Sequence, residues 1–152
     1  MESVWDYPRP PALVPCKRCV RVELAGHVVA ESTGAVRVLE TASPPTVYVP
    51  PADVAHELLR ETSRHSACEW KGRAHYADVV VGGHRAPRAA WWYPEPVVAY
   101  AALQDHVAFY PGRVACFLDE ERVRPQDGDF YGGWVTDDIA GPFKGATGTL
   151  HW

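Results

Sequence analysis

The sequence lacks the patterns that mark several large classes of protein. No apolar run approaches the roughly 20 residues of a membrane-spanning helix. No run of Lys or Arg supplies the basic surface of a nucleic-acid binder, and the formal net charge is -4. The first seven residues contain no basic segment followed by an apolar one, so they do not resemble a signal peptide. We therefore expect a cytoplasmic protein with no membrane and no nucleic-acid partner.

Signatures of catalysis and of metal binding are equally scarce. The seven His have no metal-ligand spacing, and neither a Gly-x-Ser-x-Gly elbow nor Walker-type spacing is present. The four cysteines, Cys16, Cys19, Cys68 and Cys116, are expected to be reduced thiols. Cys16-x-x-Cys19 leaves three interpretations open, namely half of a zinc site, a redox pair or coincidence, and zinc would need further ligands from distant positions. We expect no bound metal and no cofactor.

Aromatic residues and proline, by contrast, are abundant. Six Trp, seven Tyr and fourteen Pro in 152 residues favour short strands joined by turns, because aromatics suit strands and proline interrupts helices. The length is typical of one domain, and the 47% hydrophobic content is sufficient for a core. Alternating apolar and polar residues predict strands at 20–24, 28–31, 36–40, 47–49, 74–81, 107–110 and 114–118.

Helix is predicted in only two places. Pro51 suits a first helical turn, and Val54, Leu58 and Leu59 then form an apolar stripe that predicts a helix to about Arg60. One or two helical turns are expected at 97–103. Residues 1–15 are Pro-rich and are expected to form an extended surface arm held by Trp5 and Tyr7, and residues 129–152 form a Gly-rich and aromatic tail without periodicity. The predicted fold is one domain over 1–152, mostly β, with two small antiparallel sheets packed together or a partly open barrel.

The segment Cys68-Glu69-Trp70-Lys71-Gly72 concentrates a thiol, a carboxylate, an indole and an ammonium. In an extended strand Glu69 and Lys71 would share one face and Cys68 and Trp70 the other. Lys71 would then hold an anionic ligand, with Glu69 orienting it or acting as a general base. The alternative is a surface ion pair beside a buried Trp and Cys.

A second aromatic segment follows at Trp91, Trp92 and Tyr93. Alternation places Trp91 and Tyr93 on one face of a strand and Trp92 on the other. One face belongs to the core, and the other is a candidate stacking platform for a planar ligand. Core packing alone is the competing interpretation.

Four ordered blocks resemble a known family. They are Ala30-Glu31-Ser32, Cys68-Glu69-Trp70-Lys71-Gly72 with Tyr76 after it, Ala90-Trp91-Trp92-Tyr93-Pro94-Glu95-Pro96, and Val107-Ala108-Phe109. Over about residues 24–112 the sequence resembles the bacterial and fungal domain of unknown function 427 family, which also carries a nucleotidyltransferase-like label. The tail looks like the extension of longer actinobacterial members.

This resemblance implies a compact, mostly β, tent-like fold and no established activity. The sequence has no Gly-Ser motif with paired Asp residues that would hold the catalytic magnesium ions of a nucleotidyltransferase. Cys16-Lys17-Arg18-Cys19 is not part of the family pattern. Phe143-Lys144-Gly145 could cradle a phosphate through backbone N–H groups, or it could be a structural turn.

Three functions remain open from the sequence. The first is a domain that binds a small molecule, with Glu31, Glu69, Trp70, Lys71, Tyr76, Trp91, Tyr93 and Trp134 as its site. The second is a cofactor-independent enzyme that acts on an aromatic or phosphorylated metabolite, with Glu69, Lys71 and the Cys68 thiol as candidate catalytic residues. The third is a non-catalytic interaction module, and assembly as a homodimer is a further open alternative. The first two require Lys71 and Trp91 to border a common hollow.

Overall fold

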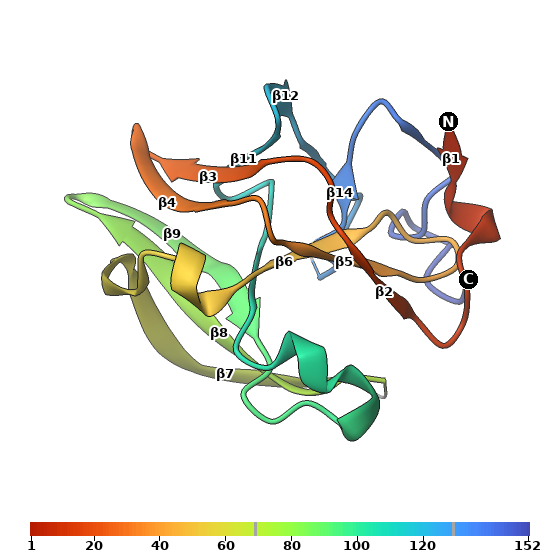
Figure 1. Cartoon of the computed structure of the whole chain (residues 1–152), viewed down its shortest axis with the longest axis horizontal. Coiled ribbons are helices and arrows are strands. Elements are labelled where there is room, and N and C mark those ends of the chain that lie inside the picture. Colours follow the sequence, from red (N-terminus) through yellow and green to blue (C-terminus); the bar gives the residue numbers. More distant parts are fainter. Residues whose placement is uncertain (69, 129) are drawn as a thin grey trace.

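A computed structural model describes residues 1–68, 70–128 and 130–152 and consists mainly of β-strands (Figure 1). The largest element is a seven-stranded antiparallel sheet with the strand order β2-β5-β6-β10-β9-β8-β7. Its strands are β2 Ala12–Pro15, β5 Val36–Leu39, β6 Thr46–Val49, β7 Leu59–Cys68, β8 Gly72–Val81, β9 His84–Trp92 and β10 Val107–Phe109.

A four-stranded antiparallel sheet packs on one face of this large sheet. Its order is β12-β11-β3-β4, from Glu121–Arg122, Ala115–Leu118, Val20–Leu24 and His27–Ser32. Two short ladders complete the β-structure, one between β1 (Glu2–Ser3) and β15 (Ile139–Ala140) and one between β13 (Arg124–Pro125) and β14 (Trp134–Val135). Figure 1 shows β3, β4 and β11 stacked above β8 and β9.

The alternation of side chains gives the large sheet two different faces. In β6, Val47 and Val49 point toward the small sheet, and Tyr48 between them points the other way. In β9 and the residue after it, Trp92 faces the small-sheet side, whereas Trp91 and Tyr93 face the opposite side. Aliphatic packing therefore fills the space between the sheets, and aromatic side chains cover the outer face.

The predicted mostly β fold with antiparallel sheets is confirmed, and all seven predicted strands are present within two residues of their expected ends. The Gly82-Gly83 turn joins β8 to β9, with Val81 paired to His84. The predicted helical turns near 97–103 are present as the 3-10 helix η4, Val98–Leu103. The large sheet is wider than expected because β2 and β7, which the alternation did not predict, form its two edges.

The predicted helix from Pro51 to Arg60 is wrong. Only two 3-10 turns form, η2 Pro51–Asp53 and η3 His56–Leu58, and strand β7 begins directly afterwards at Leu59. The stripe of Val54, Leu58 and Leu59 is apolar because these side chains pack against the core between the sheets, not because they share a helix face.

The N-terminal residues are integrated into the fold more than a surface arm would be. They supply β1, the 3-10 helix η1 (Val4–Asp6) and the edge strand β2. Val4 and Tyr7 are buried, and Trp5 stacks edge-on against Trp152 with ring centroids 5.2 Å apart. In the described part of the chain, no helix is long and apolar enough to span a membrane.

Candidate functional site

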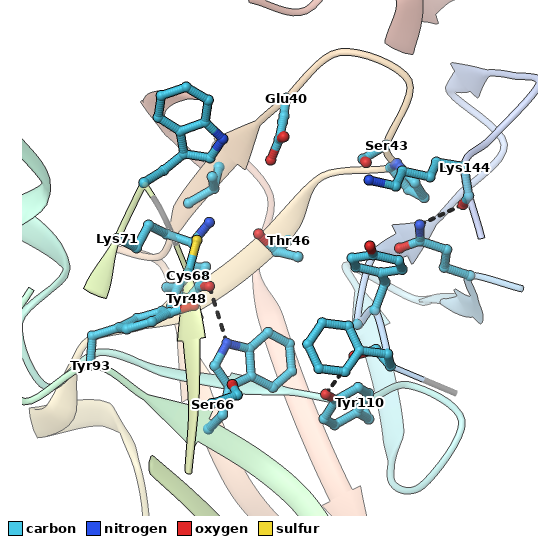
Figure 2. A pocket seen from close by; sticks show the side chains of 18 of the residues that line it. Glu40, Ser43, Thr46, Tyr48, Ser66, Cys68, Lys71, Tyr93, Tyr110 and Lys144 are labelled. Carbon is cyan, nitrogen blue, oxygen red and sulfur yellow. Dashed lines mark hydrogen bonds between the residues drawn. The ribbon is translucent and has the colours of Figure 1, made fainter. Parts of the chain in front are cut away.

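A cavity of about 270 Å³ lies on the aromatic face of the large sheet (Figure 2). Strands β5 to β9 supply its floor and one side, the 40–46 segment supplies its rim, and Gln126, residues 130–132 and Lys144 supply the opposite side. Its lining residues are Val38, Glu40, Ser43, Pro44, Thr46, Tyr48, Ser66, Ala67, Cys68, Trp70, Lys71, Tyr76, Trp91, Tyr93, Tyr110, Gln126, Phe130, Tyr131, Gly132 and Lys144. The volume equals that of about nine water molecules in the liquid, so the cavity suits a small ligand.

Lys71 is the most deeply placed cation of the cavity. It follows the end of β7 in the tight connection to β8 and is only 8% exposed. Burial opposes its charge, but attraction to Tyr48, Cys68 and Glu40 outweighs this and raises the pKa of Lys71 above its usual value. Lys71 is therefore an ammonium at neutral pH.

No carboxylate among the described residues forms an ion pair with this ammonium. Glu40 is the only acidic residue that lines the cavity within the described ranges, and its Oε2 lies 3.8 Å from Arg9 Nε. The ammonium is therefore buried without a carboxylate in ion-pair contact among the described residues. The cavity thus offers a positive charge that an anionic ligand would neutralise.

The floor of the cavity is a packed group of aromatic side chains. The Trp91 indole donates a hydrogen bond from Nε1 to the Tyr48 hydroxyl at 3.2 Å, and its ring centroid lies 4.7 Å from that of Tyr110. Burial raises the pKa of Tyr48, Tyr93 and Tyr110, so their hydroxyls remain protonated at neutral pH. The floor presents flat apolar rings with neutral hydroxyl groups, which suits a planar ligand.

The C-terminal segment forms the wall opposite Lys71. Gln126 is buried and fixes this segment with its amide, which donates to the Lys144 carbonyl at 2.5 Å and accepts from the Gly133 N–H at 3.0 Å. The backbone N–H of Lys144 donates to the Ala42 carbonyl at 2.7 Å. Figure 2 shows the Lys71 and Lys144 side chains entering the cavity from opposite sides, with Glu40, Ser43 and Thr46 at the rim between them.

Gly132 lets this wall approach the floor closely. A Cβ at this position would lie 2.3 Å from Trp91 Cη2 and 2.7 Å from Trp91 Cζ3. No side chain larger than hydrogen fits there unless the wall or the indole moves. The tail and the floor are therefore in direct contact at one end of the cavity.

The structure brings six of the predicted site residues to this cavity and leaves two elsewhere. Cys68, Trp70, Lys71, Tyr76, Trp91 and Tyr93 all line it. Glu31 is exposed on β4 of the small sheet, opposite Arg21, and does not reach it. Trp134 is buried between the sheets, where its Nε1 donates to the Phe109 carbonyl at 3.0 Å. Glu69 lies outside the described residues.

The local geometry near Lys71 differs from an extended strand. Cys68 and Lys71 both line the cavity, because the chain turns between β7 and β8. Gly72 adopts a positive φ of 116°, and a Cβ there would meet the Glu95 carbonyl at 3.3 Å. This glycine permits close approach of the 95–97 backbone, whose Val97 N–H donates to the Lys71 carbonyl at 3.0 Å. Its role is to fix the turn that holds Lys71.

Two further segments singled out in the sequence are the tail at 143–145 and the pair of Cys16 and Cys19. The N–H groups of Lys144 and Gly145 donate to the Ala42 carbonyl and to Thr149 Oγ1, so these two groups are not free to cradle a phosphate. Cys16 and Cys19 belong to no group of three convergent metal ligands within residues 1–68, 70–128 and 130–152.

Several lining residues were missed by the sequence reasoning. The alternation of Val47, Tyr48 and Val49 was a signal for Tyr48, since a strand with buried valines must point the intervening tyrosine to the other face. Tyr131, Gln126 and Gly132 had no such signal, because the tail has no periodicity.

Comparison with known families agrees with these blocks of sequence. A family model described as Domain of unknown function (DUF427) matches residues 12–120, and the chain belongs to this family. No curated protein matches the chain. The matched region contains Lys71 and the aromatic floor, and the wall that carries Lys144 lies beyond it.

Proposed function

We propose that this member of the domain of unknown function 427 family binds a small organic anion with a planar portion in the Lys71 cavity. The observation that carries the proposal is the buried Lys71 ammonium, which faces a cavity and has no ion-pair partner among the described residues. An anionic group next to Lys71 would gain a charge-assisted hydrogen bond in a poorly solvated place. The planar portion would lie against the rings of Trp91, Tyr48 and Tyr93.

The size of the cavity narrows the class of ligand. A volume of about 270 Å³ accommodates on the order of ten non-hydrogen atoms. A complete nucleoside triphosphate has many more non-hydrogen atoms than this. An aromatic carboxylate or phosphate ester fits the volume, the charge and the aromatic floor together. This argues against the nucleotide chemistry suggested by the family's alternative label.

A second cation, Lys144, favours a ligand whose negative charge can reach both lysines. Lys144 lines the side opposite Lys71, with its Nζ 4.9 Å from the centre of the Tyr131 ring. Only one carboxylate of the described residues, Glu40, lines the cavity against these two ammonium groups. The resulting positive balance favours anions over neutral analogues of the same shape.

Matched probes and matched variants test this proposal. The probes are benzoate and phenyl phosphate, with uncharged benzamide as the neutral analogue. The chain has three lysines, and Lys17 is exposed away from the cavity, so Lys17→Met controls for the loss of one positive charge. We expect both anions to raise the melting temperature and to change tryptophan fluorescence in the wild type and in Lys17→Met.

Lys71→Met should abolish these effects, and Lys144→Met should weaken them. Without probe, the free energy of unfolding of Lys71→Met should lie within about 1 kcal/mol of the wild-type value. The substitution loses the attraction to Glu40 but also removes the cost of burying a charge, and these two effects oppose each other. Equal responses of the wild type to benzoate and benzamide would contradict the proposal. So would an unchanged response to benzoate in a folded Lys71→Met variant.

The catalytic alternative stays a prediction. It needs Glu69 as the partner of Lys71, and Glu69 lies outside the described residues. The interaction-module alternative is favoured by a flat aromatic patch, whereas these aromatic side chains line a hollow. Binding is therefore the function that the geometry supports best.

A further inference from the structure

Three potential metal ligands converge on the other face of the large sheet. Glu61, His65 and His75 each offer a ligand atom, and these atoms lie within 4.8 Å of one another. Glu61 Oε2 is 3.0 Å from His75 Nδ1, and the two imidazole centroids are 4.2 Å apart. Within the described ranges no other His, Cys, Asp or Glu side chains form such a group of three.

The register of the β7–β8 hairpin produces this cluster. His65 pairs directly with His75, and Glu61 pairs with Ala77. Four residue steps of β7 therefore stand opposite two steps of β8, and the extra residues bulge outward. The bulge is held by Thr62, whose hydroxyl donates to the Tyr76 carbonyl at 3.1 Å. It shortens the distance along the hairpin and brings Glu61 beside His75.

We propose that Glu61, His65 and His75 bind a divalent first-row transition ion of the class that prefers imidazole ligands. Two imidazoles and one carboxylate suit Zn²⁺ and its neighbours, whereas Mg²⁺ and Ca²⁺ prefer oxygen ligands alone. Ligand atoms about 2.1 Å from one ion lie at most about 4.2 Å apart. The ligand atoms lie within 4.8 Å of one another, and Glu61 Oε2 and His75 Nδ1 are already within the limit at 3.0 Å. Small rotations of these side chains bring any wider pair within it.

A hollow next to the cluster gives this ion an open side. This second hollow, of about 470 Å³, is lined by Glu61, Trp92, Leu59 and Asp105 among others. His75 pairs with Trp92 in the sheet, and their rings are 6.1 Å apart. Three protein ligands leave at least one coordination position for water or for a molecule in the hollow, as in catalytic rather than structural metal sites. The site is separate from the Lys71 cavity, because Tyr76 and His75 point to opposite faces of β8.

Arg73 is the internal competitor of the ion. Its Nη2 lies 2.6 Å from His65 Nδ1, so it occupies one imidazole nitrogen and adds a positive charge beside the cluster. An ion must displace this guanidinium or repel it. Removal of Arg73 should therefore increase the affinity for the ion. No such increase is expected if these side chains only make polar contacts with one another at the surface.

Titration with Co²⁺ after removal of metals by a chelator tests the proposal. The visible spectrum of Co²⁺ distinguishes imidazole and carboxylate ligands from thiolates, and calorimetry gives the stoichiometry. We expect one Co²⁺ per chain without a thiolate band. Binding should be lost in His75→Ala, weakened about tenfold or more in Glu61→Gln, and strengthened in Arg73→Ala. His84→Ala, at an exposed turn histidine, should behave as the wild type.

Circular dichroism shows whether each variant folds. If His75→Ala does not fold, Glu61→Gln still tests the proposal. The proposal is overturned if the folded variants bind Co²⁺ as the wild type does, if the spectrum shows thiolate ligation, or if no binding occurs. Failure here leaves the Lys71 cavity untouched, since its test uses other residues and other probes.

Discussion

The contact between the C-terminal wall and the cavity floor leads to a sharp prediction about two glycines. Gly132→Ala would place a Cβ 2.3 Å from Trp91 Cη2. The indole cannot easily yield, because Nε1 is bonded to Tyr48 and its ring packs on Tyr110. Gly34→Ala is the matched control, since a Cβ there meets only ordinary contacts at 3.9 Å. Neither glycine has a positive φ, so backbone strain does not distinguish them.

The magnitudes follow from packing and chain entropy. Loss of a glycine restricts the unfolded chain, which stabilises the folded state by about 0.4–1 kcal/mol at both positions. Overpacking against Trp91 costs about 1–3 kcal/mol at position 132 alone. With an unfolding entropy of ~0.3 kcal/mol/K for 152 residues, Gly132→Ala should lower the melting temperature by up to about 9 °C. Gly34→Ala should raise it by about 1–3 °C.

Thermal unfolding followed by circular dichroism and by tryptophan fluorescence measures both changes. The two variants should shift in opposite directions, and only Gly132→Ala should also weaken the response to benzoate. If Gly132→Ala is as stable as Gly34→Ala, the wall does not press on the indole. The segment that carries Gly132 would then not close this end of the cavity.

Two further outcomes follow from single hydrogen bonds. Tyr48→Phe removes the acceptor of the buried Trp91 N–H, so it should cost about 1–3 kcal/mol in urea unfolding, and an unchanged urea midpoint would contradict that bond. The pKa of Glu2 is held below its ordinary value of 4.5 by the Arg37 guanidinium, whose Nη2 lies 2.5 Å from Glu2 Oε2, and by the Tyr7 hydroxyl. The ionised Glu2 therefore contributes fully to stability above pH 4.5. This contribution is lost as the pH falls through the lower pKa of the folded state. Glu2→Gln should therefore reduce the stability difference between pH 7 and pH 3, whereas Glu57→Gln, at an exposed position, should leave that difference as in the wild type.

The fold was largely predictable because period-two alternation is a local property. Val20–Leu24 alternates apolar and charged residues in the sequence, and in the structure Val20 and Val22 are buried whereas Arg21 and Glu23 stay partly exposed. The same criterion failed at β7, which carries polar residues on both faces, such as His65 on one face and Ser66 on the other. With no alternation to read, the apolar residues before it suggested a helix. Edge strands of this kind depend on their neighbour for pairing, which the sequence does not display.

The two candidate sites differ in how far sequence reasoning could reach them. Lys71 and Trp91 line one cavity, and both belong to the sequence blocks whose unusual residue types suggested a shared site. The position of Lys144 depends on how Gln126 and Ala42 hold the tail, and no local pattern encodes such long-range contacts. The group of Glu61, His65 and His75 was missed for a similar reason. These residues come together in space only through the pairing of β7 with β8 and the bulge in that hairpin.

The manner in which the wall opposite Lys71 is attached bears on how binding preference can change. This wall is held by backbone bonds to Ala42 and Pro45, by the Gln126 amide and by the Tyr110 hydroxyl, which donates to the Phe130 carbonyl, and not by the ladders of the seven-stranded sheet. Substitutions at Tyr131 or Lys144 therefore reshape one side of the hollow without altering any strand pairing of that sheet. For the binding that we propose, the lysine at the β7–β8 turn and the tail are thus two parts of the hollow that can be altered independently.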